Sequence, residues 1–485
     1  MSVVASPYDT CAVKSGAVKL PPNSDDAPDS DDDAGLFRSD VRYADQFVKR
    51  YASEVRFCAA KKQWVIFDPE RGWVLDDSNL IMAKAADYAR ELYQWGARRA
   101  VTMKPTDGAD LLKTMAGLGN RHRIEPALVF AASNPQIGVR PDELDGDAYL
   151  IGVHNGVIDI RTGDFSPHSH GQLITRRLAT SFDASAKCPV FDAFLAEVQP
   201  DLEMRAFLQR LAGYSLSGAV SEHVLPFHYG TGANGKGTFL EQCLLKLAGS
   251  YGAKLTDDFV YANSKGRSPH LELANLCGAR FALGEENSEG GALNEALLKS
   301  VSGGDRQKGR FHYGNFIEYF PTYKTHLVGN HKPRIVGTDD GIWRRFLLID
   351  WPVQIPSVRR DGTLKDRLAA EFPGLLNWAL VGARDWLAHG LQPPASCTAA
   401  TAVYRQQSDR LAEFVQAHFT PTDDGVVTKA SVFDAYREWC SEEGIRNAMS
   451  KRGLGFQLAN RGWSEGTEGH EKRHVWRGFL RKIHA

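Results

Sequence analysis

The sequence predicts an α/β fold, and three observations carry this prediction. Residues 196–395 alternate between helical and strand patterns, as an α/β domain does. Inside this range, at 224–247, an apolar stretch is followed by a glycine-rich loop and then by an amphipathic helix. Residues 426–485 show two helical patterns and then two strand patterns around a glycine-rich turn, which is the order of a winged-helix-like domain.

Composition divides the 485-residue chain into four segments. Residues 1–35 hold seven aspartates against two lysines, and such a segment cannot bury enough apolar surface to fold. We therefore expect a disordered acidic tail at 1–35 and a mixed α/β domain at 36–195. The central α/β domain is expected at 196–395. A linker and the winged-helix-like domain are expected at 396–485.

Local patterns place several elements within these segments. Residues 64–67 form an aromatic strand pattern, and residues 80–93 have the spacing of an amphipathic helix. Turn signals such as Asn155-Gly156 separate apolar runs at 149–167, which predicts hairpin-like strands. Near the C-terminus, Ser450 is expected to cap a helix that ends at Asn460.

The overall composition excludes several classes of protein. Apolar residues make up 43% and charged residues 24%, so the chain is neither disordered as a whole nor collagen-like. The net charge of −1 argues against a polybasic coat but leaves room for local basic patches. The seven cysteines form no CxxC pair, which favours reduced thiols in the cytoplasm. We expect no membrane span, because no uncharged apolar run approaches about 20 residues.

The strongest local motif is the glycine-rich loop. Its residues are Gly230, Thr231, Gly232, Ala233, Asn234, Gly235, Lys236, Gly237 and Thr238. A strand, a glycine loop, a lysine and a helix in this order are what a P-loop requires. The glycines let backbone N–H groups face phosphate oxygens, and Lys236 neutralises phosphate charge at the start of the helix. The loop therefore predicts ATP binding, with Lys236 exposed in the phosphate cradle.

One position departs from the strict P-loop pattern. That pattern has Ser or Thr directly after the lysine, where its hydroxyl contacts Mg²⁺. This chain has Gly237 there, and Thr238 follows. Two interpretations stay open: Thr238 lies near the α-phosphate while water completes the metal shell, or the Thr238 hydroxyl moves into the metal site.

Paired carboxylates follow the loop by about 50 residues. Glu285 and Glu286 end the apolar strand pattern that begins at Arg280. In a P-loop protein such a pair holds the metal ion and activates the attacking water. We expect Glu285 to hold Mg²⁺ and Glu286 to act as the general base.

Two further motifs complete the expected catalytic set. Asn330 ends a strand pattern that begins at Lys324, and its amide is placed to bond the γ-phosphate and orient water. Arg344 and Arg345 follow fourteen and fifteen residues later. An arginine presented to the γ-phosphate of a neighbouring subunit would complete the site in trans, and the sequence does not distinguish between the two.

The ordered set of motifs resembles superfamily 3 helicases, in the phage, plasmid and poxvirus primase-helicase branch. The set consists of the glycine loop, Glu285-Glu286, the run from Leu298 to Asp305, Asn330 and Arg344-Arg345. The resemblance extends over roughly 45–480 and implies an AAA+-like helicase domain at 196–395. It further implies a homo-oligomeric ring, a hexamer, that uses ATP and Mg²⁺ to unwind DNA during replication of a phage, prophage or plasmid-like element. Because no primase-type segment is recognisable, a separate primase is the expected partner.

Two regions are expected to contact DNA. Lys308, Arg310, His312 and Tyr313 lie in a predicted β-hairpin before the Asn330 strand, and the resemblance implies that this hairpin points into a ring channel holding a single strand. The C-terminal segment 426–485 has 11 basic and 7 acidic residues. Its Lys472, Arg473 and Arg477 are expected to bind duplex phosphates.

Two other functions remain open from the sequence. A small-molecule P-loop kinase would explain Lys236 but not Asn330 or the arginine pair. An origin-binding or partner-binding replication protein that binds ATP without turnover is also compatible, because Gly237 departs from the metal-binding pattern.

Overall fold

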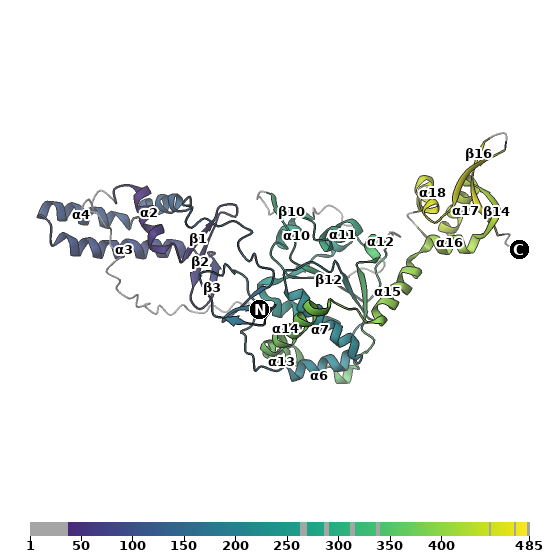
Figure 1. Ribbon diagram of the computed structural model, residues 1–485, viewed down its shortest axis with the longest axis horizontal. Helices are drawn as coiled ribbons and strands as arrows, with labels where there is room; N and C mark the ends of the chain where they lie inside the picture. Colours follow the sequence, from purple (N-terminus) through teal and green to yellow (C-terminus); the bar gives the residue numbers. More distant parts are fainter. Residues whose placement is uncertain are drawn as a thin grey trace, which may run out of the picture. The chain divides into compact units, whose positions relative to one another are not determined.

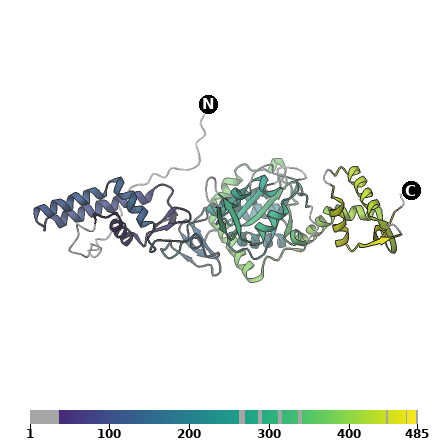
Figure 2. The ribbon, with the colours of Figure 1, turned by 90° about the horizontal axis from the view of Figure 1, so that it is seen from above.

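The computed structural model describes residues 37–261, 269–285, 291–310, 316–335, 340–445, 448–469 and 472–482. The acidic tail predicted at 1–35 lies outside these ranges. The chain divides into two compact units, with the boundary between Leu144 and Asp145 (Figures 1 and 2). None of the helices in the described ranges is long and apolar enough to cross a membrane.

The first unit combines a small antiparallel sheet with helices. Its elements are α2 (Asp40–Tyr51), β1 (Val55–Cys58), β2 (Gln63–Asp68), β3 (Gly72–Leu75), α3 (Leu80–Ala100), α4 (Pro105–Leu118) and α5 (Arg121–Ala131). The predicted strand at 64–67 lies within β2, and the predicted helix at 80–93 is the first part of α3. Glycine lets α3 and α4 pack closely, because a Cβ atom on Gly96 would lie 2.7 Å from Met115 Cγ.

The second unit begins with a three-stranded antiparallel sheet and two helices. These elements are β4 (Leu150–Val153), β5 (Gly156–Asp159), β6 (Phe165–Ser166), α6 (Pro189–Val198) and α7 (Leu202–Leu216). The predicted hairpin turn is confirmed, since Val153 pairs with Gly156. The sequence assigns residues up to 195 to the first domain, yet Ile151 and Ile158 are buried in one core cluster with Leu283 of the central sheet. Apolar burial therefore joins this segment to the second unit.

A five-stranded sheet forms the centre of the second unit. Its strands are β7 (Leu225–Tyr229), β8 (Gly252–Leu255), β9 (Phe281–Glu285), β12 (Lys324–Gly329) and β13 (Phe346–Asp350). The strand order is β13-β7-β12-β9-β8, and every neighbouring pair is parallel. The predicted α/β fold with a parallel sheet is thus present. Parallel strands of this kind are buried on both faces, which explains their near-continuous apolar sequences.

Helices cover both faces of the sheet (Figure 1). One face packs with α6, α7, η1 (Thr238–Leu245, a π-helix), α8 (Lys246–Ala248), α13 (Leu364–Ala370) and α14 (Phe372–His389). The other face packs with α9 (Asp257–Val260), α10 (His270–Asn275), α11 (Glu295–Ser302), α12 (Asp340–Trp343) and α15 (Ala395–Ser408). Two short 3₁₀ turns, η2 (Gly249–Tyr251) and η3 (Ser357–Arg359), complete this part.

A two-stranded antiparallel ribbon precedes the Asn330 strand, as the sequence predicts. It consists of β10 (Gln307–Arg310) and β11 (Phe316–Tyr319), with Arg310 opposite Phe316. The inner side packs against α10, where a Cβ atom on Gly309 would lie 2.5 Å from the Ala274 nitrogen. Residues 311–315, and with them His312 and Tyr313, lie outside the described residues.

The C-terminal part folds around its own aromatic core. Its elements are α16 (Arg410–His418), β14 (Phe419–Thr428), α17 (Lys429–Glu442), α18 (Lys451–Asn460), β15 (Ser464–Glu468) and β16 (Arg473–Arg481). The strands form one antiparallel sheet in the order β14-β16-β15. The predicted cap is confirmed, because the Ser450 hydroxyl accepts a hydrogen bond from the Gly453 N–H at 3.2 Å.

Candidate nucleotide-binding site

Three strands of the central sheet end at one edge, where the predicted motifs lie. β12 lies between β7 and β9, with Gly329 beside Tyr229 and Val328 beside Glu285. The glycine loop, Asn330 and Glu285 therefore follow or end adjacent strands. The connection after β7 runs to β8, whereas the connection after β12 runs back to β13, so connections diverge between β7 and β12. Ligands of open α/β sheets bind at the carboxyl ends of strands at such a point.

The glycine loop has a conformation that its glycines make possible. Gly232 and Gly235 have φ angles of 99° and 79°, in the region that side chains disfavour. A Cβ atom on Gly230 would lie 1.9 Å from the Asn234 amide nitrogen, so the loop closes tightly on itself. Asn234 in turn donates to the Trp351 carbonyl at 3.3 Å, which fastens the loop to the end of β13.

The backbone of the loop is suited to an anion. Within the described part of the chain, the N–H groups of residues 231–235 donate no hydrogen bond to the protein. Successive free N–H groups next to a helix N-terminus form a concave donor set for phosphate or carboxylate oxygens.

Lys236 lies below this loop and is surrounded by neutral oxygens. Its ammonium donates to the Gly230 carbonyl at 2.8 Å, to Asn330 Oδ1 at 2.6 Å and, more weakly, to Asn234 Oδ1 at 3.4 Å. The expectation that Lys236 is exposed was wrong. The side chain lies among these partners, and only 7% of its surface is accessible. Burial lowers the pKa of its ammonium. No carboxylate in the described ranges pairs with it, so a bound anion would supply the missing counter-charge.

Asn330 stands where the sequence places it, one residue beyond β12. Its side chain is exposed and its amide oxygen is occupied by Lys236. The amide NH₂ group remains the available donor of this side chain. Lys236 and Asn330 together therefore present donors from two adjacent strands to one point above the sheet.

The position after the lysine has room for a side chain. Gly237 has φ −63° and ψ −38°, ordinary helical values, and a Cβ atom there would meet no atom within 4 Å. Neither backbone strain nor crowding therefore requires glycine at this position. Thr238, the first residue of the π-helix η1, is half-buried.

Glu285 carries an ion pair that the sequence analysis missed. Its carboxylate lies 3.0 Å from the Lys254 ammonium, which also contacts Glu241 of η1 at 2.9 Å. Hydrogen bonds to Glu241 and then to Glu285 raise the pKa of Lys254. No local pattern predicts this bridge, because it depends on β8 lying beside β9. Glu286, the expected base, lies outside the described residues.

Lys254 and a metal ion would compete for Glu285, and this leads to a prediction. We expect Lys254→Met to lower the Mg²⁺ concentration that gives half-maximal ATP hydrolysis, because the carboxylate loses a competing cation. A Mg²⁺ titration of hydrolysis checks this, with Lys365→Met on the exposed side of α13 as the control. A higher Mg²⁺ requirement in Lys254→Met would show instead that the lysine supports the metal site.

The arginine pair lies at the opposite edge of the sheet. Arg344 and Arg345 precede β13, whose first residue pairs with Leu225 at the start of β7. Five-residue strands separate this edge from the glycine loop by about 15 Å. The loop of the same chain is therefore out of reach of either guanidinium.

The two arginines differ in their surroundings. Arg345 is half-buried, and its guanidinium donates to the Gly341 carbonyl at 2.6 Å. Arg344 is exposed, and its guanidinium has no hydrogen bond or ion pair among the described residues. Of the pair, Arg344 is the one that a neighbouring molecule could reach.

The outer side of the β10–β11 ribbon carries cations on and before β10, and Glu318 between Phe316 and Phe320 on the other strand. Glu318 pairs with Arg306 at 3.4 Å and with Lys308 at 3.7 Å. Lys308 and Arg310 both lie over the Phe316 ring, at 4.9 and 5.2 Å from its centroid. Arg306 lies over the Phe320 ring at 5.1 Å. Both rings are large exposed hydrophobic surfaces. The sequence analysis named Lys308 and Arg310 but missed the two phenylalanines, although their i, i+4 spacing on a strand places them on one side.

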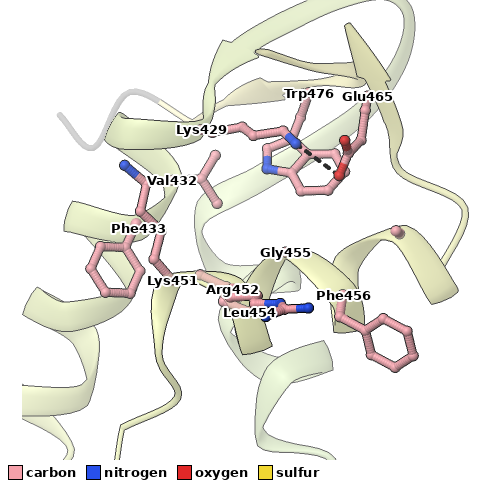
Figure 3. A pocket seen from close by; sticks show the side chains of 11 residues that line it. Lys429, Val432, Phe433, Lys451, Arg452, Leu454, Gly455, Phe456, Glu465 and Trp476 are labelled. Carbon is pink, nitrogen blue, oxygen red and sulfur yellow. Dashed lines mark ion pairs between the residues drawn. The ribbon is translucent and has the colours of Figure 1, made fainter. Parts of the chain in front are cut away.

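The C-terminal part gathers basic residues in two places. Lys472 and Arg473 lie immediately before and at the start of β16, and Arg477 lies across from Ser464 at the other end of the β15–β16 pair. A second group, missed by the sequence analysis, surrounds a cavity of about 360 Å³ between α17, α18 and the sheet (Figure 3). Lys451 and Arg452 lie on α18 at its rim.

Aromatic and ionic contacts define the rest of this cavity. Phe456 projects from α18 with 65% of its surface exposed (Figure 3). Lys429 lies over the Trp476 ring at 4.4 Å and pairs with Glu465 at 2.7 Å. Because Glu465 is already neutralised, the rim carries the uncompensated charge of Lys451 and Arg452.

The donor sets of the described residues favour a phosphate ligand over a protein-held metal. No group of three or more His, Cys, Asp or Glu side chains in the described ranges could hold a metal ion. The free loop N–H groups and the buried Lys236 ammonium fit the phosphates of a nucleotide. A metal ion at this edge would depend on the nucleotide phosphates together with Glu285 and Thr238.

Sequence comparisons agree with this architecture. The family described as "D5 N terminal like" matches residues 44–200, and the family described as "Poxvirus D5 protein-like" matches residues 406–481. A protein of Acanthamoeba polyphaga mimivirus named "Putative helicase" is 29% identical over 322 residues, which are 61% of this chain and 33% of that protein. A protein of Frog virus 3 with the same designation is 27% identical over 268 residues, 51% of this chain and 27% of that protein.

A solved structure, the apo A form of the NrS-1 C-terminal region, covers 89% of this chain with a TM-score of 0.46 and 11% identity. The chain spans about a third or less of the length of the viral relatives that it matches. The two D5 family matches cover the regions before and after the central parallel sheet. The chain is thus similar, over parts of its length, to the two D5 families and to viral proteins named as putative helicases.

Proposed function

We propose that this protein is an ATP-dependent DNA helicase of superfamily 3 that acts in the replication of a phage, prophage or plasmid-like element. One observation carries the proposal. Among the described residues, the buried Lys236 ammonium has no carboxylate partner, lies under a loop of free N–H groups and contacts Asn330 just beyond the adjacent strand. This arrangement suits the terminal phosphates of a nucleoside triphosphate, whose charge would complete the site.

Each residue has a definite task in this proposal. The loop N–H groups and Lys236 hold the phosphates of ATP, and the Asn330 amide senses the terminal one. Glu285 and Thr238 would hold Mg²⁺, which supplies charge neutralisation for phosphoryl transfer. Glu286 would polarise the attacking water.

The position of Arg344 supports a site shared between subunits. Its exposed guanidinium lies at the edge of the sheet away from the glycine loop of its own chain. In a head-to-tail ring, each subunit would present this edge to the nucleotide of the next. A hexamer is the ring that the family resemblance implies.

DNA-stimulated ATP hydrolysis separates this proposal from its alternatives. We expect single-stranded DNA to increase the ATPase rate of the purified chain. A small-molecule kinase would need an acceptor and would not respond to DNA. A replication protein that only binds ATP, which Gly237 keeps open as an alternative, would bind the nucleotide without turnover.

The outer side of the β10–β11 ribbon is proposed to grip a single strand. Lys308 and Arg310 would hold phosphates, and Phe316 and Phe320 offer ring faces on which bases can stack. Base–aromatic stacking contributes about 1–3 kcal/mol per base. The ribbon leads into β12, so a change at Asn330 on loss of the terminal phosphate could be transmitted to the bound strand.

Alanine substitutions in this ribbon provide a direct prediction. We expect Lys308→Ala/Arg310→Ala to retain DNA-independent hydrolysis and to lose stimulation by single-stranded DNA, because two phosphate contacts disappear. Phe316→Ala is expected to weaken single-strand binding by about tenfold or more, as for the loss of one stacked base. ATPase assays and fluorescence anisotropy check both. The double variant Arg360→Ala/Lys365→Ala, which removes two exposed cations elsewhere, should behave as wild type; normal stimulation in the ribbon variants would place the DNA grip elsewhere.

The C-terminal part is proposed to be a winged-helix-like module that binds duplex DNA. Its element order and its two basic groups support this assignment. We expect Lys451→Ala/Arg452→Ala and Lys472→Ala/Arg473→Ala each to reduce duplex affinity and to flatten its salt dependence by about two in the log–log slope. Arg437→Ala, on an exposed position of α17, is the control. Unchanged affinity and slope in both double variants would remove this role from the module.

A further inference from the structure

Two buried histidines lie next to each other beneath the glycine loop. His228 is in β7, two residues before Gly230, and His326 is in β12, four residues before Asn330. Neither side chain has any accessible surface. Their rings stack with centroids 5.5 Å apart, and His228 Nε2 lies 3.3 Å from His326 Nδ1. No role in phosphate binding explains why these positions are polar.

The hydrogen bonds around these rings form a chain with one direction. The Trp351 indole can only donate, and its Nε1–H lies 3.2 Å from His228 Nδ1. His228 must then carry its proton on Nε2 and donate to His326 Nδ1. His326 consequently carries its proton on Nε2 as well.

The chain of hydrogen bonds ends on helix α7. His326 Nε2 donates to the Ser215 hydroxyl at 2.8 Å, and that hydroxyl donates to the Leu211 carbonyl of α7 at 2.6 Å. Both ring nitrogens of each histidine are thereby used. A single donor, the Trp351 indole, fixes the tautomers of both histidines.

Both imidazoles are neutral in this arrangement. Burial, together with the nearby Lys236 ammonium, lowers the pKa of His228 to about 3. Burial holds the pKa of His326 well below its usual range, and the nearby Lys324 acts in the same direction. A fully satisfied, uncharged network of this kind specifies one arrangement of the strands that it joins.

Trp351 connects the chain to the nucleotide site. Its carbonyl accepts the Asn234 side chain of the glycine loop, and its N–H donates to the Tyr229 carbonyl at 2.9 Å. The same residue thus holds the loop through its backbone and the histidines through its indole. The other end of the hydrogen-bond chain reaches α7, which packs on the sheet away from the glycine loop.

We propose that Trp351, His228, His326 and Ser215 form a positioning relay that fixes the glycine loop relative to Asn330 and ties both to α7. The proposal rests on the proposed ATPase, in which Lys236 and Asn330 must meet one phosphate. The relay residues touch no reacting atom; they set the register of β7 and β12 and hence the geometry in the transition state.

Substitutions at the two ends of the relay test it without touching the loop. Trp351→Phe keeps an aromatic ring and removes the donor, and Ser215→Ala removes the final acceptor. We expect each to lower kcat about tenfold while KM for ATP stays within about twofold, since misplaced groups act on the transition state more than on binding. Ser217→Ala and Trp386→Phe are matched controls, because both residues are buried, hydrogen-bonded and outside the relay.

The outcome is decided by comparison with these controls. Relay variants whose kcat remains within twofold of wild type would overturn the proposal. So would an equal loss of kcat in the controls, since that would indicate a general effect of removing buried polar groups.

A spectroscopic measurement keeps the relay testable if the protein does not hydrolyse ATP. Solid-state NMR of ¹⁵N-histidine-labelled full-length protein should show both imidazoles as neutral Nε2–H tautomers, assigned through His228→Phe and His326→Phe. Trp351→Phe should shift both signals, because no donor then fixes the direction of the hydrogen bonds through the two histidines. Retention of both tautomers in Trp351→Phe, or a charged imidazole in the wild type at pH 7, would contradict the relay independently of turnover.

Discussion

Lys236→Met is expected to abolish ATP hydrolysis, with a loss of about 10³-fold or more, while the chain remains folded. The lysine contributes a buried positive charge at the phosphate site, and preorganised charge of this kind is usually the largest single contribution to catalysis. Methionine fills a similar volume and removes the cost of burying an ammonium, which offsets the donor lost at the Gly230 carbonyl. Steady-state hydrolysis and a thermal unfolding scan measure both effects.

Asn330→Ala is the informative companion to this variant. It removes a contact of the Lys236 ammonium but leaves the charge, so it should retain nucleotide binding and lose much of the hydrolysis rate. Turnover at the wild-type rate by folded Lys236→Met protein would disprove the assignment of the glycine loop as the phosphate site.

Arg344→Ala is expected to be as inactive alone as Lys236→Met, because an arginine that contacts the terminal phosphate is worth about 10³-fold or more in rate. Mixing the two inactive proteins should restore activity. In a mixed ring, an interface can combine an intact Lys236 from one subunit with an intact Arg344 from the next. Random assembly of equal amounts would restore about a quarter of the interfaces.

Arg345→Ala distinguishes a shared site from a general effect on the fold. Because the Arg345 guanidinium bonds the Gly341 carbonyl within its own chain, its loss should mainly reduce stability. Folded Arg345→Ala protein should therefore keep ATPase activity without mixing, unlike Arg344→Ala. Absence of recovery at every mixing ratio of Arg344→Ala and Lys236→Met would argue for a site completed within one chain.

Local patterns in the sequence were sufficient where the structure depends on neighbouring residues. Ser450 caps α18, and Asn155 with His154 forms the turn between β4 and β5, because the necessary groups lie within a few residues of each other. The glycine loop and Asn330 could also be located, since the carboxyl ends of parallel strands meet at one edge. The roles assigned to these residues remain predictions.

Features that depend on which strands are neighbours could not be found in this way. Lys254 meets Glu285 only because β8 lies beside β9, and His228 meets His326 only because β12 lies beside β7. The burial of Lys236 likewise follows from Asn330 on an adjacent strand. The segment after Asp145 gave no local sign that its apolar residues pack against the central sheet.

Strand separation on a forked DNA duplex, measured in real time with a fluorophore and a quencher on the two strands, tests the central claim most directly. The full-length protein is predicted to separate the strands with ATP and Mg²⁺, and to fail with a non-hydrolysable ATP analogue or with Lys236→Met. If the wild-type protein hydrolyses ATP in the presence of this DNA but leaves the strands paired, or separates them equally well without hydrolysis, the helicase assignment is contradicted.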